Sequence, residues 1–130
     1  MRRNLGIAIA TVLGVACSQI SFGQLTLTQR HVSNSGQEMY AAWCTACHGH
    51  EGKGDGFAGT GLTKAPPDLT MLAAAAGGKY PATAVGMTIR DGTKLMPGFG
   101  VMMERMSAGS PGEAQLRLHN LVDYVRTLQK

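Results

Sequence analysis

The sequence predicts a small all-α domain, and three observations support this fold class. No segment alternates apolar and polar residues well enough to indicate a β-strand. Two segments, Ser35 to Glu38 and Ser110 to Glu113, have the Ser-x-x-Glu spacing of a capping box at a helix start. After each of them, apolar residues recur at three- and four-residue spacing, the period of a helical face. We expect three to five helices in the 130-residue chain.

The first 23 residues have the pattern of a secretory signal peptide. Two arginines precede an apolar run from Leu5 to Ala16, and small residues stand before Gln24. The run is shorter than the roughly 20 residues of a membrane-spanning helix, although an uncleaved membrane anchor is the alternative. A lipid attached to Cys17 is a further alternative, although Gly14 stands where such signals usually carry a larger aliphatic residue.

One domain, residues 35–130, follows a polar lead-in at 24–34 that lacks periodicity and predicts a flexible segment. With 12 basic and 8 acidic residues and no basic run, the chain gives no support to nucleic-acid binding. Three cysteines exclude a disulfide-rich framework. A domain of this size with 18 glycines would be marginally stable alone, so a bound apolar group would complete its core.

The first expected helix starts at Ser35 and closes with a cysteine pair. Its apolar face consists of Met39, Tyr40, Trp43, Cys44 and Cys47. A glycine-rich loop at 49–61 and a rigid proline corner at 65–69 follow. We expect the next helix to end near Ala76, before Gly77-Gly78.

The second half is expected to contain two further clear helices separated by a loop. Pro81 starts one helix, which runs to about Arg90, and residues 95–100 form the loop. A short helix beyond the loop would carry several methionines. The last helix starts at Pro111, and its apolar face contains Leu118, Leu121, Val122, Val125 and Leu128.

Cys44-Thr45-Ala46-Cys47-His48 has the C-x-x-C-H spacing at which c-type haem is attached. Two thiols at this spacing can form thioether bonds to both vinyl groups of one porphyrin. The adjacent His48 then supplies the proximal ligand of the iron. A C-x-x-C pair alone also occurs in zinc sites and thiol redox proteins, so these remain alternatives.

Met96 is the expected distal ligand of the iron. It stands in a loop beside Pro97, 48 residues after His48, and a thioether sulfur suits this role. The ordinary alternative is a packing methionine. Other candidates for the ligand are Met102, Met103, His50 and His119. Met39 and Met71 are expected to lie on helix faces in the core.

The order of these motifs resembles that of the class I c-type cytochromes, which are small monohaem electron carriers, and with the signal peptide it resembles a bacterial exported cytochrome c domain. The resemblance covers residues 35–130. It rests on Gly36-x-x-x-Tyr40 in the first helix, Cys44 to His48, the Pro-x-Leu corner Pro67-Asp68-Leu69, Met96-Pro97, and the last-helix segment 121–125.

The resemblance implies a helical fold wrapped around one covalently attached haem c per chain. Cys44 and Cys47 would hold its vinyl groups, His48 and Met96 would ligate the iron, and the Pro67 carbonyl would accept a hydrogen bond from His48. We also expect Leu69, Tyr40, Trp43 and Phe99 to contact the haem.

The function implied is single-electron transfer between redox partner proteins that dock at an exposed haem edge. No set of residues for independent catalysis is visible, so we expect a carrier and not an enzyme. The location expected is periplasmic or otherwise exported, with membrane association only through an uncleaved signal or a lipidated Cys17. The alternatives are a haem enzyme or small-ligand sensor with an open distal site, the cytochrome subunit of a larger membrane oxidoreductase, and a thiol redox or zinc protein.

Overall fold

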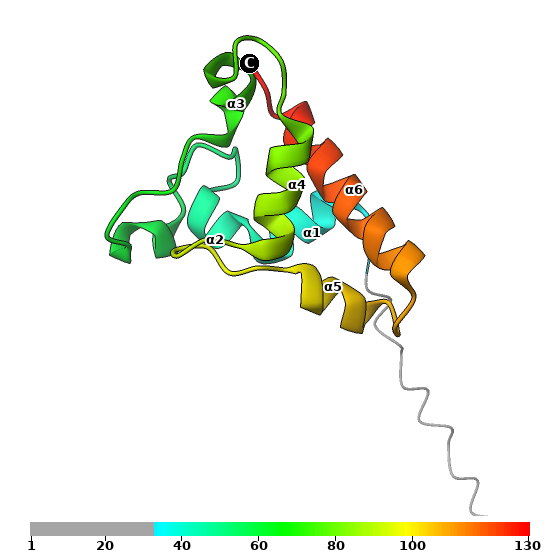
Figure 1. Cartoon of the computed structure of the whole chain (residues 1–130). Helices are drawn as coiled ribbons and strands as arrows, with labels where there is room; N and C mark the ends of the chain where they lie inside the picture. The colour runs from blue at the N-terminus through cyan, green and yellow to red at the C-terminus, as the bar shows by residue number, and fades with distance from the viewer. Residues whose placement is uncertain (1–32) are drawn as a thin grey trace, which may run out of the picture. The chain divides into compact units, whose positions relative to one another are not determined.

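The structure is a computed structural model that describes residues 33–130. The predicted signal peptide, Cys17 and most of the lead-in lie outside the described residues. The described part is helical and contains no β-strand, which confirms the all-α fold class. It has six α-helices where we expected three to five, because two of them are single turns, α2 (Thr45–His48) and α3 (Leu72–Ala75). The longer helices are α1 (Gly36–Trp43), α4 (Ala82–Asp91), α5 (Gly100–Met106) and α6 (Pro111–Thr127) (Figure 1).

Helices α1 and α6 pack closely against each other, although they lie at the two ends of the described chain (Figure 1). A Cβ atom on Gly36 would collide with the backbone carbonyl of Asn120 and lie 2.9 Å from the Cβ of Tyr124. Next to this point the rings of Tyr40 and Tyr124 are 5.2 Å apart and tilted by 50°. The absence of a side chain at residue 36 therefore sets how closely the two helices approach.

The core lies where α1, α4 and α5 meet α6. Leu121 of α6 is fully buried. The buried apolar residues are Met39, Tyr40, Ile89, Met103, Leu121, Val122 and Val125. Val122 and Val125 confirm the predicted apolar face of the last helix, and Leu118 and Leu128 pack beside it half-buried.

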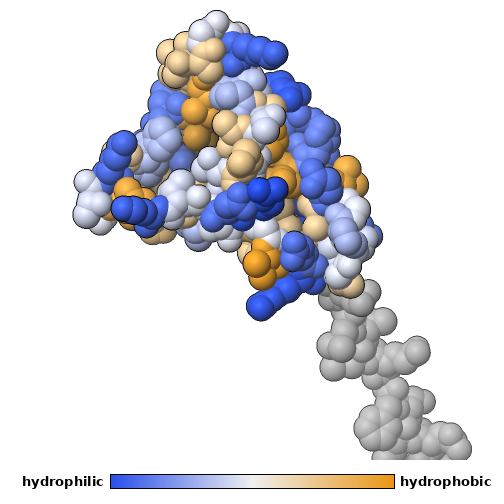
Figure 2. All heavy atoms as spheres, in the orientation of Figure 1, coloured by the Kyte–Doolittle hydropathy of each residue, from blue (hydrophilic) through white to orange (hydrophobic). Residues whose placement is uncertain are grey.

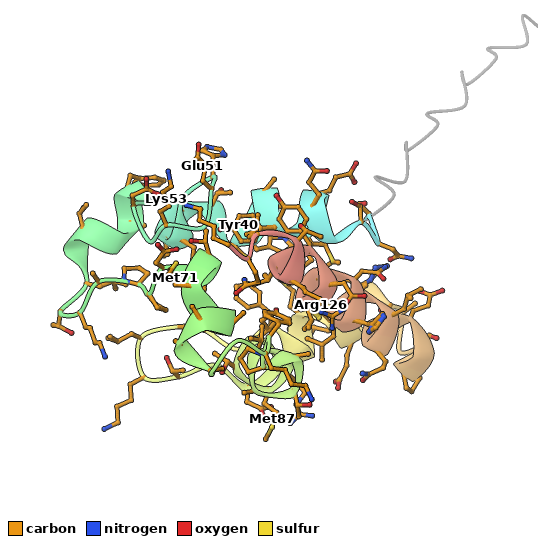
Figure 3. All side chains as sticks on the ribbon, turned by 90° about the horizontal axis from the view of Figure 1, so that it is seen from above. Tyr40, Glu51, Lys53, Met71, Met87 and Arg126 are labelled. Atoms are coloured by element: carbon orange, nitrogen blue, oxygen red, sulfur yellow. The ribbon has the colours of Figure 1, made fainter. Side chains whose placement is uncertain are left out.

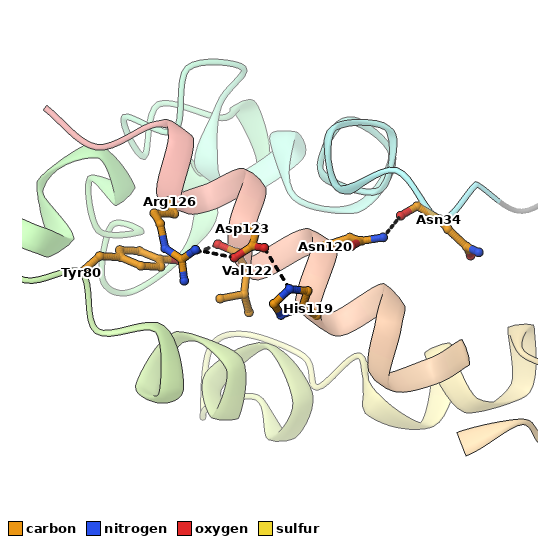
Figure 4. Close-up of polar contacts among 7 residues, drawn as sticks. All are labelled: Asn34, Tyr80, His119, Asn120, Val122, Asp123 and Arg126. Atoms are coloured by element: carbon orange, nitrogen blue, oxygen red, sulfur yellow. Dashed lines mark hydrogen bonds and ion pairs between the residues drawn. The ribbon is translucent and has the colours of Figure 1, made fainter. Parts of the chain in front are cut away.

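Polar contacts fix the outer side of α6, as Figure 4 shows. The hydroxyl of Tyr80 donates to the carbonyl of Val122 at 2.9 Å. The guanidinium of Arg126 lies 5.3 Å from the centre of the Tyr80 ring and pairs with Asp123 at 2.7 Å. Burial raises the pKa of Tyr80 to about 12, with Arg126 acting against it, so this hydroxyl stays protonated and remains a donor.

Arg117 is a buried charge that the sequence did not predict, since it is 4% exposed. Its Nε donates to the hydroxyl of Ser107 at 3.3 Å, and its Nη1 donates to the side-chain oxygen of Asn34. The amide of Asn120 donates to the backbone carbonyl of Asn34 at 2.7 Å. Arg117 thus joins the residues before α1 to the turn between α5 and α6.

The predicted helix starts are close to the observed ones, but the caps differ in detail. The hydroxyl of Ser35 accepts from the Glu38 amide at 3.5 Å, as expected, while the Ser35 amide donates to Ser33 instead of Glu38. Pro111 occupies the first turn of α6, but Ser110 makes no side-chain cap. Pro81 is the N-cap of α4, so this helix begins at Ala82, one residue later than predicted.

Apolar side chains on the surface are scattered. On the face shown in Figure 2, hydrophobic atoms lie interspersed with hydrophilic ones. Met71, expected in the core, is 44% exposed because the turn that carries it is short. Within residues 33–130, no helix combines the length and apolar character that a membrane crossing requires.

Substituting Gly36 by Ala should destabilise the fold, because the new methyl group would press on the backbone of α6. We expect a loss of about 1–3 kcal/mol, the usual range for overpacking. The matched control is Gly86→Ala in α4, whose Cβ would meet Val122 at an ordinary 3.6 Å. This control should be neutral or stabilise by about 0.5–1 kcal/mol. Urea unfolding measures both, and equal effects would contradict the close approach at Gly36.

Candidate functional site

A cavity of about 620 Å³ lies between α1, α4 and α6 and the loops that follow α2 and α4. Its wall is mainly apolar. Every site residue that the sequence predicted lies along this one cavity, namely Tyr40, Trp43, Cys44, Cys47, His48, Pro67, Leu69, Met96 and Phe99. Their individual roles stay predictions, but the fold brings these residues together from three separate segments of the chain, 40–48, 67–69 and 96–99.

Cys44 separates α1 from α2, and Cys44, Cys47 and His48 of the C-x-x-C-H run line the cavity. Cys44 ends α1 and its carbonyl accepts from the His48 amide at 2.9 Å. Gly49 ends α2 with φ +76°, and a Cβ there would collide with the Asp55 carboxylate. Both thiols are free and partly exposed.

Tyr40 holds the end of this run in place. Its hydroxyl donates to the carbonyl of Gly49 at 2.8 Å, and its side chain is 1% exposed. Burial raises the pKa of Tyr40, so its hydroxyl remains a donor throughout the neutral range. Figure 3 shows Tyr40 among the helices, with Glu51 and Lys53 at the outer edge of the loop beyond α2.

His48 is buried, and its imidazole faces a carbonyl from the proline corner. Nδ1 is enclosed and has no partner of regular hydrogen-bond geometry among the described residues. Burial lowers the pKa of His48, while the Pro67 carbonyl acts in the opposite direction and raises it. A buried neutral imidazole with a carbonyl beside one nitrogen is the arrangement that metal-ligating histidines adopt.

The thiol of Cys44 has a raised pKa and so favours its protonated form. Burial, and then the neighbouring Cys47, raise the pKa of Cys44 to about 11. A redox-active thiol requires a lowered pKa, because the thiolate is the nucleophile. This shift therefore speaks against the thiol redox alternative.

The wall formed by residues 67–72 is anchored from the far end of the chain. The side chain of Gln129 donates to the Leu69 carbonyl at 2.7 Å and accepts from the Ala73 amide at 2.8 Å. The Leu69 amide also donates to the Gly52 carbonyl at 2.7 Å. Figure 1 shows the end of the chain beside α3. The sequence gives no signal for the role of Gln129, because a polar residue after a helix is typical of any surface.

The loop between α4 and α5 carries Met96 to the cavity. It begins at Gly92, with φ +76°, and the Phe99 amide donates to the Ile89 carbonyl at 2.9 Å to close it. The ring of Phe99 stacks on Trp43 with the ring centres 6.1 Å apart and the planes 15° apart. This contact ties the Met96 loop to α1.

The other ligand candidates lie elsewhere. Among the methionines of the described residues, Met96 alone lines this cavity. Met103 is 1% exposed in the core, His50 is exposed, and His119 pairs with Asp123 at 3.1 Å on the outer side of α6. Cavity residues that we did not predict include Val85 and Ile89 of α4, which share a helical face at four-residue spacing.

The side chains on this wall are of the types that hold a covalently attached iron porphyrin. Two free thiols, a buried imidazole and a thioether line one apolar cavity, and its volume is in the range of cofactor sites. Within residues 33–130, no group of three or more His, Cys, Asp or Glu side chains is placed to hold a metal ion by itself.

Fold and site together define a c-type cytochrome domain. Comparison with protein families supports this: a family model described as cytochrome c oxidase, cbb3-type, subunit III, matches residues 32–108. Since the match covers more than half of the chain, the protein belongs to this family, which confirms the resemblance to c-type cytochromes. Searches of the curated proteins and of the solved structures found no significant match.

Replacing Tyr40 by Phe should weaken the fold by about 1–3 kcal/mol, because the buried Gly49 carbonyl would lose its donor. The loss is measured by urea unfolding of the haem-loaded protein. Tyr124→Phe is the matched control, since Tyr124 packs on the same ring and its hydroxyl makes no hydrogen bond within residues 33–130. Equal stability of the two variants would show that the bond to Gly49 is unimportant.

Proposed function

We propose that this chain is an exported monohaem carrier of single electrons, with iron ligated by His48 and Met96. The c-type cytochrome domain supports haem-based electron transfer. The observation that carries the proposed ligation is the shared cavity wall, which contains both Met96 and His48.

The haem iron, when bound, supplies a ferric/ferrous couple that takes up and releases one electron. The protein holds the ligands and excludes water. Cys44 and Cys47 anchor the porphyrin edge, and the Pro67 carbonyl orients the imidazole of His48. Met96 would supply the second protein ligand of the iron, which would leave no open position for a substrate. Thioether ligation also favours the ferrous state and raises the reduction potential.

Electron exchange requires a partner at the open side of the cavity. Lys64 and Lys94 line the cavity and are exposed, and no Asp or Glu of the described residues lines it. An acidic partner protein would be steered to this side by the charge, in a small and transient interface. We infer that such redox proteins, and not nucleic acids, are the partners.

A second candidate function is that of a cytochrome subunit in a membrane oxidoreductase. The family match favours it, because the matching description is that of an oxidase subunit. In that case the electron-transfer chemistry of the site is the same, and only the partner differs. Export to the periplasm, with the signal peptide removed or kept as an anchor, agrees with both functions.

The ligation proposal is tested by the visible spectra of ferric and ferrous protein exported with its haem-attachment machinery. We expect the weak ferric charge-transfer band of thioether ligation at the red end of the spectrum, and its loss in Met96→Ala. Met87→Ala is the control, because Met87 is 53% exposed and points away from the fold (Figure 3). A wild type that lacks the band and whose ferrous form binds carbon monoxide would support an open enzyme or sensor site.

The intact mass of the exported protein under denaturing conditions should equal that of residues 24–130 plus one haem. This follows from signal cleavage before Gln24 and from two thioether bonds, which survive unfolding. Lipid mass on Cys17 or a retained residue 1 would instead indicate an anchor. A chain without haem mass would contradict covalent attachment.

A further inference from the structure

The loop that presents Met96 contains one hydroxyl that organises its backbone. The Oγ1 atom of Thr93 accepts from the amide of Leu95 at 3.2 Å and from the amide of Met96 at 3.0 Å. In return, the Thr93 amide donates to the Met96 carbonyl at 2.8 Å. Thr93 and Met96 are therefore joined in both directions across a tight turn.

The ends of this loop are fixed by backbone packing. A Cβ on Gly92 would lie 2.6 Å from the Met96 carbonyl oxygen, and a Cβ on Gly98 would lie 2.8 Å from the Asp91 carbonyl oxygen. In the part of the chain that the structure describes, Thr93 is the residue of the 92–98 loop whose side chain makes hydrogen bonds. Backbone contacts thus hold the ends of the loop, and the Thr93 hydroxyl supplies the side-chain hydrogen bonds in the turn that carries Met96.

We propose that Thr93 is a positioning residue that keeps the Met96 thioether in place and so keeps the distal side closed to small ligands. This inference rests on the proposed ligation by Met96. Without the Thr93 oxygen, the amides of Leu95 and Met96 have no partner in the turn and must bind water. The turn then samples other conformations, and the fraction of time with an open iron position increases. An added ligand binds only to that open fraction, so its apparent affinity reports the effect directly.

The test is titration of the ferric holoprotein with imidazole, followed in the visible spectrum. Thr93→Val keeps the shape of the side chain and removes the acceptor. We expect it to bind imidazole about tenfold more tightly than wild type, because the net contribution of such hydrogen bonds is about 1.4 kcal/mol. Thr93→Ser keeps the hydroxyl and should remain within about twofold of wild type.

Thr83→Val is the matched control. Thr83 is exposed on α4 and does not line the cavity, and its hydroxyl makes no hydrogen bond among the described residues. We expect its imidazole affinity to equal that of wild type. If Thr93→Val fails to load haem, Thr93→Ala provides the same comparison without the second branch at Cβ.

The outcomes separate the two proposals. A wild-type ferric spectrum without the thioether band overturns both, and the wild type alone shows this. If the band is present, unchanged affinity in Thr93→Val overturns only the role of Thr93. Equal tightening in Thr93→Ser and Thr93→Val overturns it as well, because the hydroxyl would then not be the cause.

Discussion

The close contact between α1 and α6 is the constraint on which the rest of the structure depends. Helix α1 has eight residues, too few to be stable alone, so it exists because α6 covers its apolar face. The missing side chain at Gly36 allows this approach, and Tyr40 and Leu121 fill the contact. Since α1 leads directly into Cys44 and α2, the position of α6 determines where the two thiols and His48 lie.

The cavity combines a firmly held side with a more lightly held one. On the His48 side, the Tyr40 hydroxyl, the Gly52 carbonyl and Gln129 converge on the loop after α2 and on the proline corner. On the Met96 side, a loop is closed by backbone contacts and by the stacking of Phe99 on Trp43. A carrier that changes oxidation state with little rearrangement would benefit from both, because the two proposed ligands, His48 and Met96, lie on segments that are themselves held in place.

The chemical residues were predictable because their signals are local: Cys44 to His48 lie within one turn, and Met96 stands beside a proline in a loop. The helices were predictable from spacing and from glycine and proline positions. Long-range polar contacts could not be predicted from the sequence. A charged residue in a helix is typical of a solvent-facing side, yet Arg117 is buried against Asn34, 83 residues away. Met71 was expected on a helix face in the core, whereas the short turn that carries it leaves its side chain 44% exposed.

The contact of Gln129 with Leu69 and Ala73 joins residues 60 and 56 positions apart. A ribosome makes the C-x-x-C-H run first and residue 129 much later. Until then, the 67–72 wall has no anchor from α6, and α1 has no helix to pack on. The site can therefore close around the cysteines only after α6 has packed on α1 and Gln129 has reached the 67–72 wall.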